Sequence, residues 1–131
     1  MTLTPDHTPY AALGGEPGLH RLVDRFYDLM DELPEAYNAR RIHPESLDGA
    51  RQGLFEFLSG WLGGPPLYES AYGHPRLRAR HLPFPIGESE RDQWLMCMRM
   101  AIDEVMPEQV DSDEFFKALV GLADHMRNKA G

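Results

Sequence analysis

Cysteine, long apolar runs and basic residues are all scarce in this chain of 131 residues. The single cysteine, Cys97, excludes a disulfide within the chain and argues against a disulfide-stapled secreted scaffold. No apolar run has the length that a bilayer requires, and residues 1–9 carry neither the basic stretch nor the apolar stretch of a signal peptide. We therefore expect a soluble, cytoplasmic protein without membrane contact.

Positively charged residues are also few: the chain has 13 Lys and Arg against 21 Asp and Glu, which gives a formal net charge of −8. Nucleic-acid binding needs concentrated basic side chains, and the densest basic cluster, residues 76–80, is too short to follow a duplex. We expect no nucleic-acid partner. The length and the hydrophobic fraction of 42% predict a single domain over residues 1–131, with residues 1–9 and 128–131 as flexible ends.

The alternation that is typical of strands is missing, and apolar residues recur at helical spacing instead. Helices are predicted over about 17–33, 35–40, 46–62 and 88–106, followed by a last helix that ends near residue 126, so the fold class is all-α. Ser46 is expected to cap the helix that follows it. Residues 65–75 are expected to form a long loop, and such loops in small domains usually serve function.

One segment carries the strongest functional signal. It reads Gly73-His74-Pro75-Arg76-Leu77-Arg78-Ala79-Arg80-His81-Leu82-Pro83-Phe84-Pro85-Ile86-Gly87. Pro83 and Pro85 cannot continue a helix, so His81 is expected in the last turn of a short helix, among arginines. An imidazole on a rigid basic rim suits an anionic cofactor with a metal at its centre. The alternative is a histidine that only complements the helix dipole.

Further motifs accompany this segment along the chain. They are Gly14-Gly15, Arg25-Phe26-Tyr27, Trp61-Leu62-Gly63-Gly64-Pro65, and Glu90-Arg91-Asp92-Gln93-Trp94 with Cys97-Met98. Together with residues 73–84 they resemble the group II truncated haemoglobins, over nearly the whole chain from Tyr10 to about Arg127. The resemblance implies a truncated globin, a two-over-two helical sandwich around one haem b.

On the proximal side, the resemblance implies that His81 is the ligand of the haem iron, through a neutral imidazole nitrogen. Haem propionates are carboxylates, which arginines hold through charge-assisted hydrogen bonds. Arg78 is the implied propionate partner, with His74 and Tyr68 as further candidates. The alternative for the arginines is a solvated basic face.

On the distal side, the resemblance implies that Tyr27 and Trp94 donate hydrogen bonds to a bound gas ligand, whereas periodicity alone would place both in an aromatic core. His43 matches a corner position beside this pocket, where it could bond to Tyr27 or to the ligand; the alternative is a surface histidine before a proline. Ala50 stands where ordinary globins carry a distal histidine, and it offers no hydrogen bond. Leu54 is expected beside it.

Apolar contacts with the porphyrin follow from the same resemblance, and each of these residues has plain core as its alternative. They are Leu54, Phe57, Leu58, Leu77, Phe84, Ile86 and Met98, with Trp94 also against the porphyrin.

Three functions are compatible with this sequence. The first is reversible binding of dioxygen, as a carrier, store or sensor that also takes nitric oxide, carbon monoxide or peroxide. The second is an enzyme that oxidises nitric oxide to nitrate or reduces peroxide; it would need a reductase, because the chain has no flavin or nicotinamide fingerprint. The third is a helical interaction module without haem. A monomer and a homodimer are both expected possibilities.

Overall fold

A computed structural model describes residues 8–74, 76, 81, 84–106 and 112–126, and every regular element among them is a helix. The elements, in chain order, are α1 (Pro9–Leu13), α2 (Gly15–Glu32), the 3-10 turn η2 (Pro34–Ala36), α3 (Tyr37–Arg41), α4 (Asp48–Trp61), α5 (Leu67–Tyr72), α7 (Glu88–Val105) and α8 (Ser112–Met126). The predicted all-α class is confirmed. Within the described residues, none of these helices is both long enough and apolar enough to cross a membrane.

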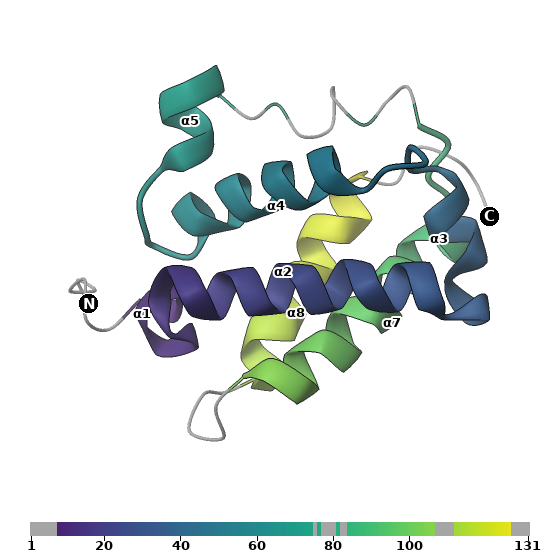
Figure 1. The fold of residues 1–131 in the computed structure, drawn as a ribbon, viewed down its shortest axis with the longest axis horizontal. Coiled ribbons are helices and arrows are strands. Elements are labelled where there is room, and N and C mark those ends of the chain that lie inside the picture. The colour runs from purple at the N-terminus through teal and green to yellow at the C-terminus, as the bar shows by residue number, and fades with distance from the viewer. Residues whose placement is uncertain (1–7, 75, 77–80, 82–83, 107–111, 127–131) are drawn as a thin grey trace.

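The four long helices form two pairs. Figure 1 shows α4 lying along α2, with α7 and α8 crossing behind them. Helix α2 packs against both α4 and α7, and α7 packs against α8. This arrangement is the two-over-two sandwich that the sequence predicts.

The apolar stripe of α2 forms the centre of the core. Leu19, Leu22, Val23 and Phe26 are at most 1% exposed, and they recur at the spacing of one helix face. Helix α7 faces them with a buried stripe that includes Met98. Polar pairs tie the helices at their exposed edges: Arg25 of α2 bonds Glu104 of α7, and Arg91 of α7 bonds Asp124 of α8.

The prediction of a long loop over residues 65–75 is partly wrong, because Leu67–Tyr72 forms helix α5. Helix α5 packs against α4, and the Ser59 hydroxyl donates to the Pro65 carbonyl oxygen at 2.7 Å just before it. A helix of six residues is too short to be stable alone or to show a periodic pattern. Its tertiary contact with α4 therefore stabilises a segment that local sequence does not identify.

The starts of α4 and α2 differ from the predicted ones, and a third predicted helix cannot be compared. Helix α4 begins at Asp48 with Leu47 at the N-cap, and Ser46 instead accepts a hydrogen bond from the Asp48 amide at 3.3 Å. Before α2, the chain forms α1, whose N-cap Thr8 accepts from the Ala11 amide at 3.1 Å. The short helix expected to end at His81 falls almost entirely outside the described residues.

Close approach of α1 and α2 requires a glycine at position 18. A Cβ there would lie 1.9 Å from the Leu13 carbonyl oxygen, which is backbone and cannot swing away. We expect Gly18→Ala to lower the free energy of unfolding by about 2–3 kcal/mol, the range of an overpacked core. Urea unfolding followed by far-UV circular dichroism measures this change.

Gly121 of α8 is the matched control, because an added Cβ there would meet no atom within 4 Å among the described residues beyond its chain neighbours and its own helix backbone. Gly121→Ala should raise the free energy of unfolding by up to about 1 kcal/mol, since alanine is the better helix former. Similar unfolding midpoints for the two variants would contradict a steric role for position 18.

Candidate functional site

A cavity of about 450 Å³ lies beside α4, and α2, α3, α5, α7, α8 and the segment with His81 also contribute residues to its wall. The wall is mostly apolar, with polar side chains at a few points. The predicted site residues that line it are Tyr27, His43, Ala50, Leu54, Phe57, Tyr68, His81, Phe84, Ile86 and Trp94. The fold thus brings both the predicted proximal and the predicted distal residues to one cavity.

Tyr27 projects from α2 and is only 4% exposed. Its ring meets Phe26 edge-on at 4.7 Å between centroids, and the Arg51 guanidinium lies 5.8 Å from its centroid. Burial raises the pKa of the phenol well above its ordinary value, against a smaller opposite effect of Arg51. The group therefore keeps its proton. Its hydroxyl has no hydrogen bond within the described part of the chain, so it can donate one to a molecule in the cavity.

Trp94 reaches the same cavity from the first turns of α7 and is half-buried. Its ring meets Phe26 edge-on at 4.8 Å, so Phe26 packs against both predicted donors. Among the described residues, no acceptor bonds the indole N–H. An indole nitrogen can only donate, which adds a second donor to the cavity wall.

His43 follows α3 and lies at the cavity wall, with its ring 5.9 Å from the Tyr27 ring. Its Nδ1 lies 2.8 Å from the Ala39 carbonyl oxygen. Burial lowers the pKa of His43; the bond to Ala39 opposes this shift, and Arg40 and His81 add to it. The imidazole is therefore neutral at pH 7.

The corner that holds His43 is fixed by a neighbouring arginine. Arg40 bonds Asp31 at 2.9 Å and donates to the backbone oxygens of Pro44 and Glu45. Gln93 of α7 accepts from the Ala39 amide at 3.0 Å. These contacts connect the corner that carries His43 to α2 and α7.

His81 lines the cavity from the segment between α5 and α7. Its ring lies 6.4 Å from that of Phe84, and its carbonyl oxygen accepts from the Phe84 amide at 3.0 Å. Ile86 follows and is buried, two residues before α7 begins. The Phe84 amide thus bonds back to His81, and both residues lie on one wall of the cavity.

The remaining predicted site residues lie elsewhere. Leu58 and Met98 are fully buried in the helical core and are not part of the cavity wall. His74 is exposed, and its Nδ1 accepts from the Arg76 amide at 3.1 Å. Arg78 and Leu77 lie outside the described residues, so their roles stay predictions.

Several wall residues are absent from the sequence-based site. They are Ala39, Ile42, Pro44, Ser46, Gly49, Gly53, Glu90, Arg91, Leu122, Ala123 and Met126. The spacing of Ala123 and Met126 does predict a buried face for α8, but it does not tell a cavity wall from a core. The position of Glu90 in the first turn of α7 could have indicated a capping role: its carboxylate accepts from the Gly87 amide at 2.9 Å, as the acidic residue of a capping box does.

Arg51 was also missed, and no sequence pattern marks it. It donates to Asp28 at 2.8 Å and to Asp24 at 3.2 Å, both on α2. These bonds join α4 to α2 directly beside Tyr27. Arg51 thereby positions the helix that carries Ala50 and Leu54 relative to the phenol.

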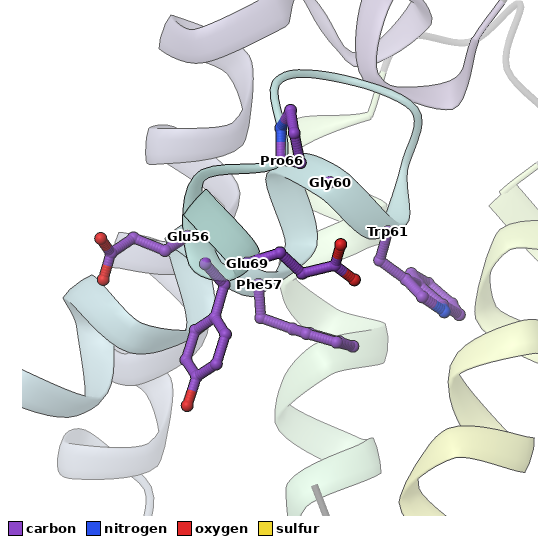
Figure 2. A pocket seen from close by; sticks show the side chains of 7 residues that line it. Glu56, Phe57, Gly60, Trp61, Pro66 and Glu69 are labelled. Atoms are coloured by element: carbon purple, nitrogen blue, oxygen red, sulfur yellow. The ribbon is translucent and has the colours of Figure 1, made fainter. Parts of the chain in front are cut away.

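A second, smaller pocket of about 150 Å³ lies between α4 and α5. Figure 2 shows the side chains of Phe57 and Trp61 from α4 beside Glu69 from α5. Phe57 and Tyr68 line both pockets, so the two share a wall. The larger cavity is lined by His43 and His81 and by the predicted donors Tyr27 and Trp94, and it is therefore the candidate site.

Comparisons with known proteins agree with this geometry. The profile of the bacterial-like globin family matches residues 8–128. The group 2 truncated hemoglobin YjbI of Bacillus subtilis (strain 168) is 42% identical over 123 residues, which cover 94% of this chain and 90% of that protein.

Two solved structures are similar in fold and sequence. The group II 2-on-2 hemoglobin of Agrobacterium tumefaciens superposes with a TM-score of 0.89 at 46% identity, over 95% of each chain. The cold-adapted truncated hemoglobin of Pseudoalteromonas haloplanktis also gives a TM-score of 0.89, at 44% identity over 93% of this chain and 98% of that one.

Proposed function

The chain belongs to the bacterial-like globin family, as a group II truncated haemoglobin, and from this premise we propose that it holds one haem b in the large cavity and binds dioxygen there. Nitric oxide, carbon monoxide and peroxide are further ligands of the same site. The role is that of a carrier, store or sensor, or of a redox detoxifier.

The residues present fit a haem. A largely apolar cavity of about 450 Å³ suits a flat macrocycle, and one histidine on its wall suffices as a protein ligand for an iron that the macrocycle already holds. When bound, haem supplies the iron centre at which a gas ligand is taken up. His81 would hold that iron by a ring nitrogen, with Phe84 and Ile86 as apolar neighbours on the same wall.

One observation carries the proposal: the same cavity that contains His81 also contains two donors, Tyr27 O–H and Trp94 N–H, that bond no acceptor among the described residues. Donors aimed into an apolar space stabilise a ligand that carries partial negative charge. Each neutral hydrogen bond contributes about 1 kcal/mol net, and more where water is excluded. Slow release of dioxygen follows from two such bonds.

The periphery of the haem is also part of the proposal. Arg78 would hold a propionate through a charge-assisted hydrogen bond, with Tyr68 at the cavity wall and His74 as further partners. Leu54 and Phe57 would contact the porphyrin from α4, and Leu77 is proposed as a further apolar contact, whereas Leu58 and Met98 lie in the helical core. Ala50 leaves space on the distal side because its side chain is a single methyl group.

An absorption spectrum of the purified protein tests this function. We expect a Soret band, a pyridine haemochrome spectrum of haem b, equimolar haem and chain, and a reversible shift of the band when dioxygen or carbon monoxide is added to the reduced protein. A chain without a Soret band after incubation with haemin contradicts the proposal and favours a haem-free helical module.

Kinetics with nitric oxide distinguish reversible dioxygen binding from nitric oxide dioxygenase activity. In a stopped-flow experiment, the oxygenated protein is mixed with nitric oxide in the presence of a reductase. Repeated turnover to nitrate favours a nitric oxide dioxygenase, because polar distal donors also stabilise charge that develops on oxygen. A single turnover favours reversible binding as the role.

A further inference from the structure

The smaller pocket between α4 and α5 differs in chemistry from the larger cavity. Three of the residues that line it are aromatic, namely Phe57, Trp61 and Tyr68, and two are acidic, namely Glu56 and Glu69. None of its lining residues is basic. Its volume of about 150 Å³ is below the roughly 300 Å³ at which pockets for larger organic ligands begin. The pocket therefore suits one small molecule.

The part of the pocket wall formed by Gly60 and Pro66 is held by the turn that joins α4 to α5. The Ser59 hydroxyl donates to the Pro65 carbonyl oxygen at 2.7 Å, and the Gly64 amide donates to the Ser59 carbonyl oxygen at 2.8 Å. A Cβ at Gly60 would lie 3.1 Å from the Pro66 Cα, so the bare glycine permits a close approach. A wall that is held in this way lowers the cost of ordering it around a ligand.

Phe57 and Trp61 present two aromatic rings on one side of α4. They are four residues apart, which places them on successive turns, and their rings lie 6.4 Å apart between centroids with an angle of 25° between the planes. Trp61 is 39% exposed, so its indole can be reached from outside. The face of an aromatic ring is electronegative and attracts cations, and tryptophan does so most strongly.

Glu69 of α5 adds a carboxylate to this aromatic wall. Figure 2 shows its side chain extending toward Trp61, beside Phe57. Within the described part of the chain, neither Glu69 nor Glu56 forms an ion pair. The Glu56 carboxylate accepts a hydrogen bond from the Tyr72 hydroxyl at 3.2 Å, which is a neutral partner. The negative charge at this pocket is thus not compensated by a basic side chain.

We propose that this pocket binds a small quaternary ammonium ion. Its methyl groups pack against the rings of Phe57 and Trp61, and its charge lies beside the Glu69 carboxylate. A primary ammonium group is a poorer match, because it needs several hydrogen-bond acceptors and is strongly hydrated, whereas aromatic rings offer no such acceptors. This inference does not depend on the proposed haem site.

The same wall disfavours other classes of ligand. A Ca²⁺ ion takes six to eight oxygen ligands, and no cluster of three or more His, Cys, Asp or Glu suited to a metal ion occurs among the described residues. An anion would be repelled by Glu56 and Glu69. A phosphatidylcholine headgroup contains a quaternary ammonium, but it would also bring a phosphate close to these carboxylates. The free ion is therefore the expected ligand.

Titration of the holoprotein with choline at constant ionic strength tests this site. In the reduced, carbon monoxide-bound form, which is diamagnetic, ¹⁵N–¹H spectra follow the backbone amides of α4 and α5. We expect saturable shifts of signals near Gly60 and Glu69. The neutral analogue 3,3-dimethyl-1-butanol, which has the shape of choline without its charge, should bind about tenfold more weakly.

Variants of the two proposed contacts locate the site. Glu69→Gln keeps the shape of the side chain without its charge and should raise the dissociation constant of choline about three- to fivefold, as expected for an exposed ion pair. Glu35→Gln is the matched control, because it changes the net charge equally at an exposed position outside the pocket. Trp61→Leu removes the aromatic face and should weaken binding by a similar factor, with Trp61→Phe in between.

Equal affinity for choline and its neutral analogue would overturn the inference, as would unchanged affinity in both Glu69→Gln and Trp61→Leu or the absence of saturable shifts in α4 and α5. Co-sedimentation of the protein with phosphatidylcholine vesicles would overturn the free ion as the ligand. If a variant does not fold, the comparison of the two probes on the unmodified chain still decides. A chain that takes up no haem is already diamagnetic and is titrated in the same way, so failure of the proposed function is a separate result.

Discussion

His81→Gly is expected to lose its haem. The substitution removes the imidazole that we propose as the iron ligand, while the apolar wall formed by residues such as Phe84 and Ile86 stays in place. Loss of a partner that only orients a ligand weakens metal binding by about 10–100-fold, and loss of the ligand itself should exceed that range. The Soret absorbance per chain and the rate of haem transfer to an acceptor protein measure the effect.

Imidazole added to the His81→Gly protein provides the internal control. We expect it to restore the Soret band, because the free ring can occupy the space that the side chain leaves. His20→Gly is the matched variant, since it removes an imidazole from outside the cavity and should retain its haem. A His81→Gly protein that keeps its haem and its spectrum without imidazole would exclude His81 as the ligand.

Tyr27→Phe is expected to accelerate the release of dioxygen by about tenfold, because one hydrogen bond in a dry cavity is lost. Phenylalanine keeps the ring, so the edge contact with Phe26 at 4.7 Å can persist. Trp94→Phe removes the second donor and should act in the same direction. Because the two donors share one ligand, the double variant need not equal the product of the single effects.

Stopped-flow measurement of dioxygen dissociation from the reduced holoprotein checks these rates. Tyr37→Phe is a suitable control for the phenol, since Tyr37 is 66% exposed and lies outside the cavity wall. Trp61→Phe serves the same purpose for the indole, because Trp61 lines only the smaller pocket. Unchanged rates in both Tyr27→Phe and Trp94→Phe would contradict their assignment as distal donors.

Periodicity predicted the long helices well because each buries a continuous stripe. Helix α7 runs from Glu88 to Val105, within one residue of the predicted 88–106. The short helix α5 has no such stripe, and its residues are largely exposed apart from the contact with α4. Ser46 has the chemistry of a cap and accepts from the amide of Asp48, the first residue of α4, but it lies one residue before the N-cap, Leu47.

The candidate site was less predictable than the helices. Periodicity alone favoured an aromatic core for Tyr27 and Trp94, and only the resemblance suggested a distal role. The structure places both on the wall of a cavity, while Leu58 and Met98, which share similar helix faces, lie in the core. Apolar spacing shows which side of a helix is buried. The neighbouring helices determine whether a residue on that side packs against side chains or borders a cavity.

Apolar spacing, prolines and short motifs act locally along the chain, so the fold class, the family and the position of His81 before a proline-rich stop could be predicted before folding was considered. Which buried residues border the cavity, and how Arg51 joins α4 to α2 beside Tyr27, became visible only in the folded structure. Those properties depend on atoms from different helices and on hydrogen-bond geometry. No pattern in one segment can specify them.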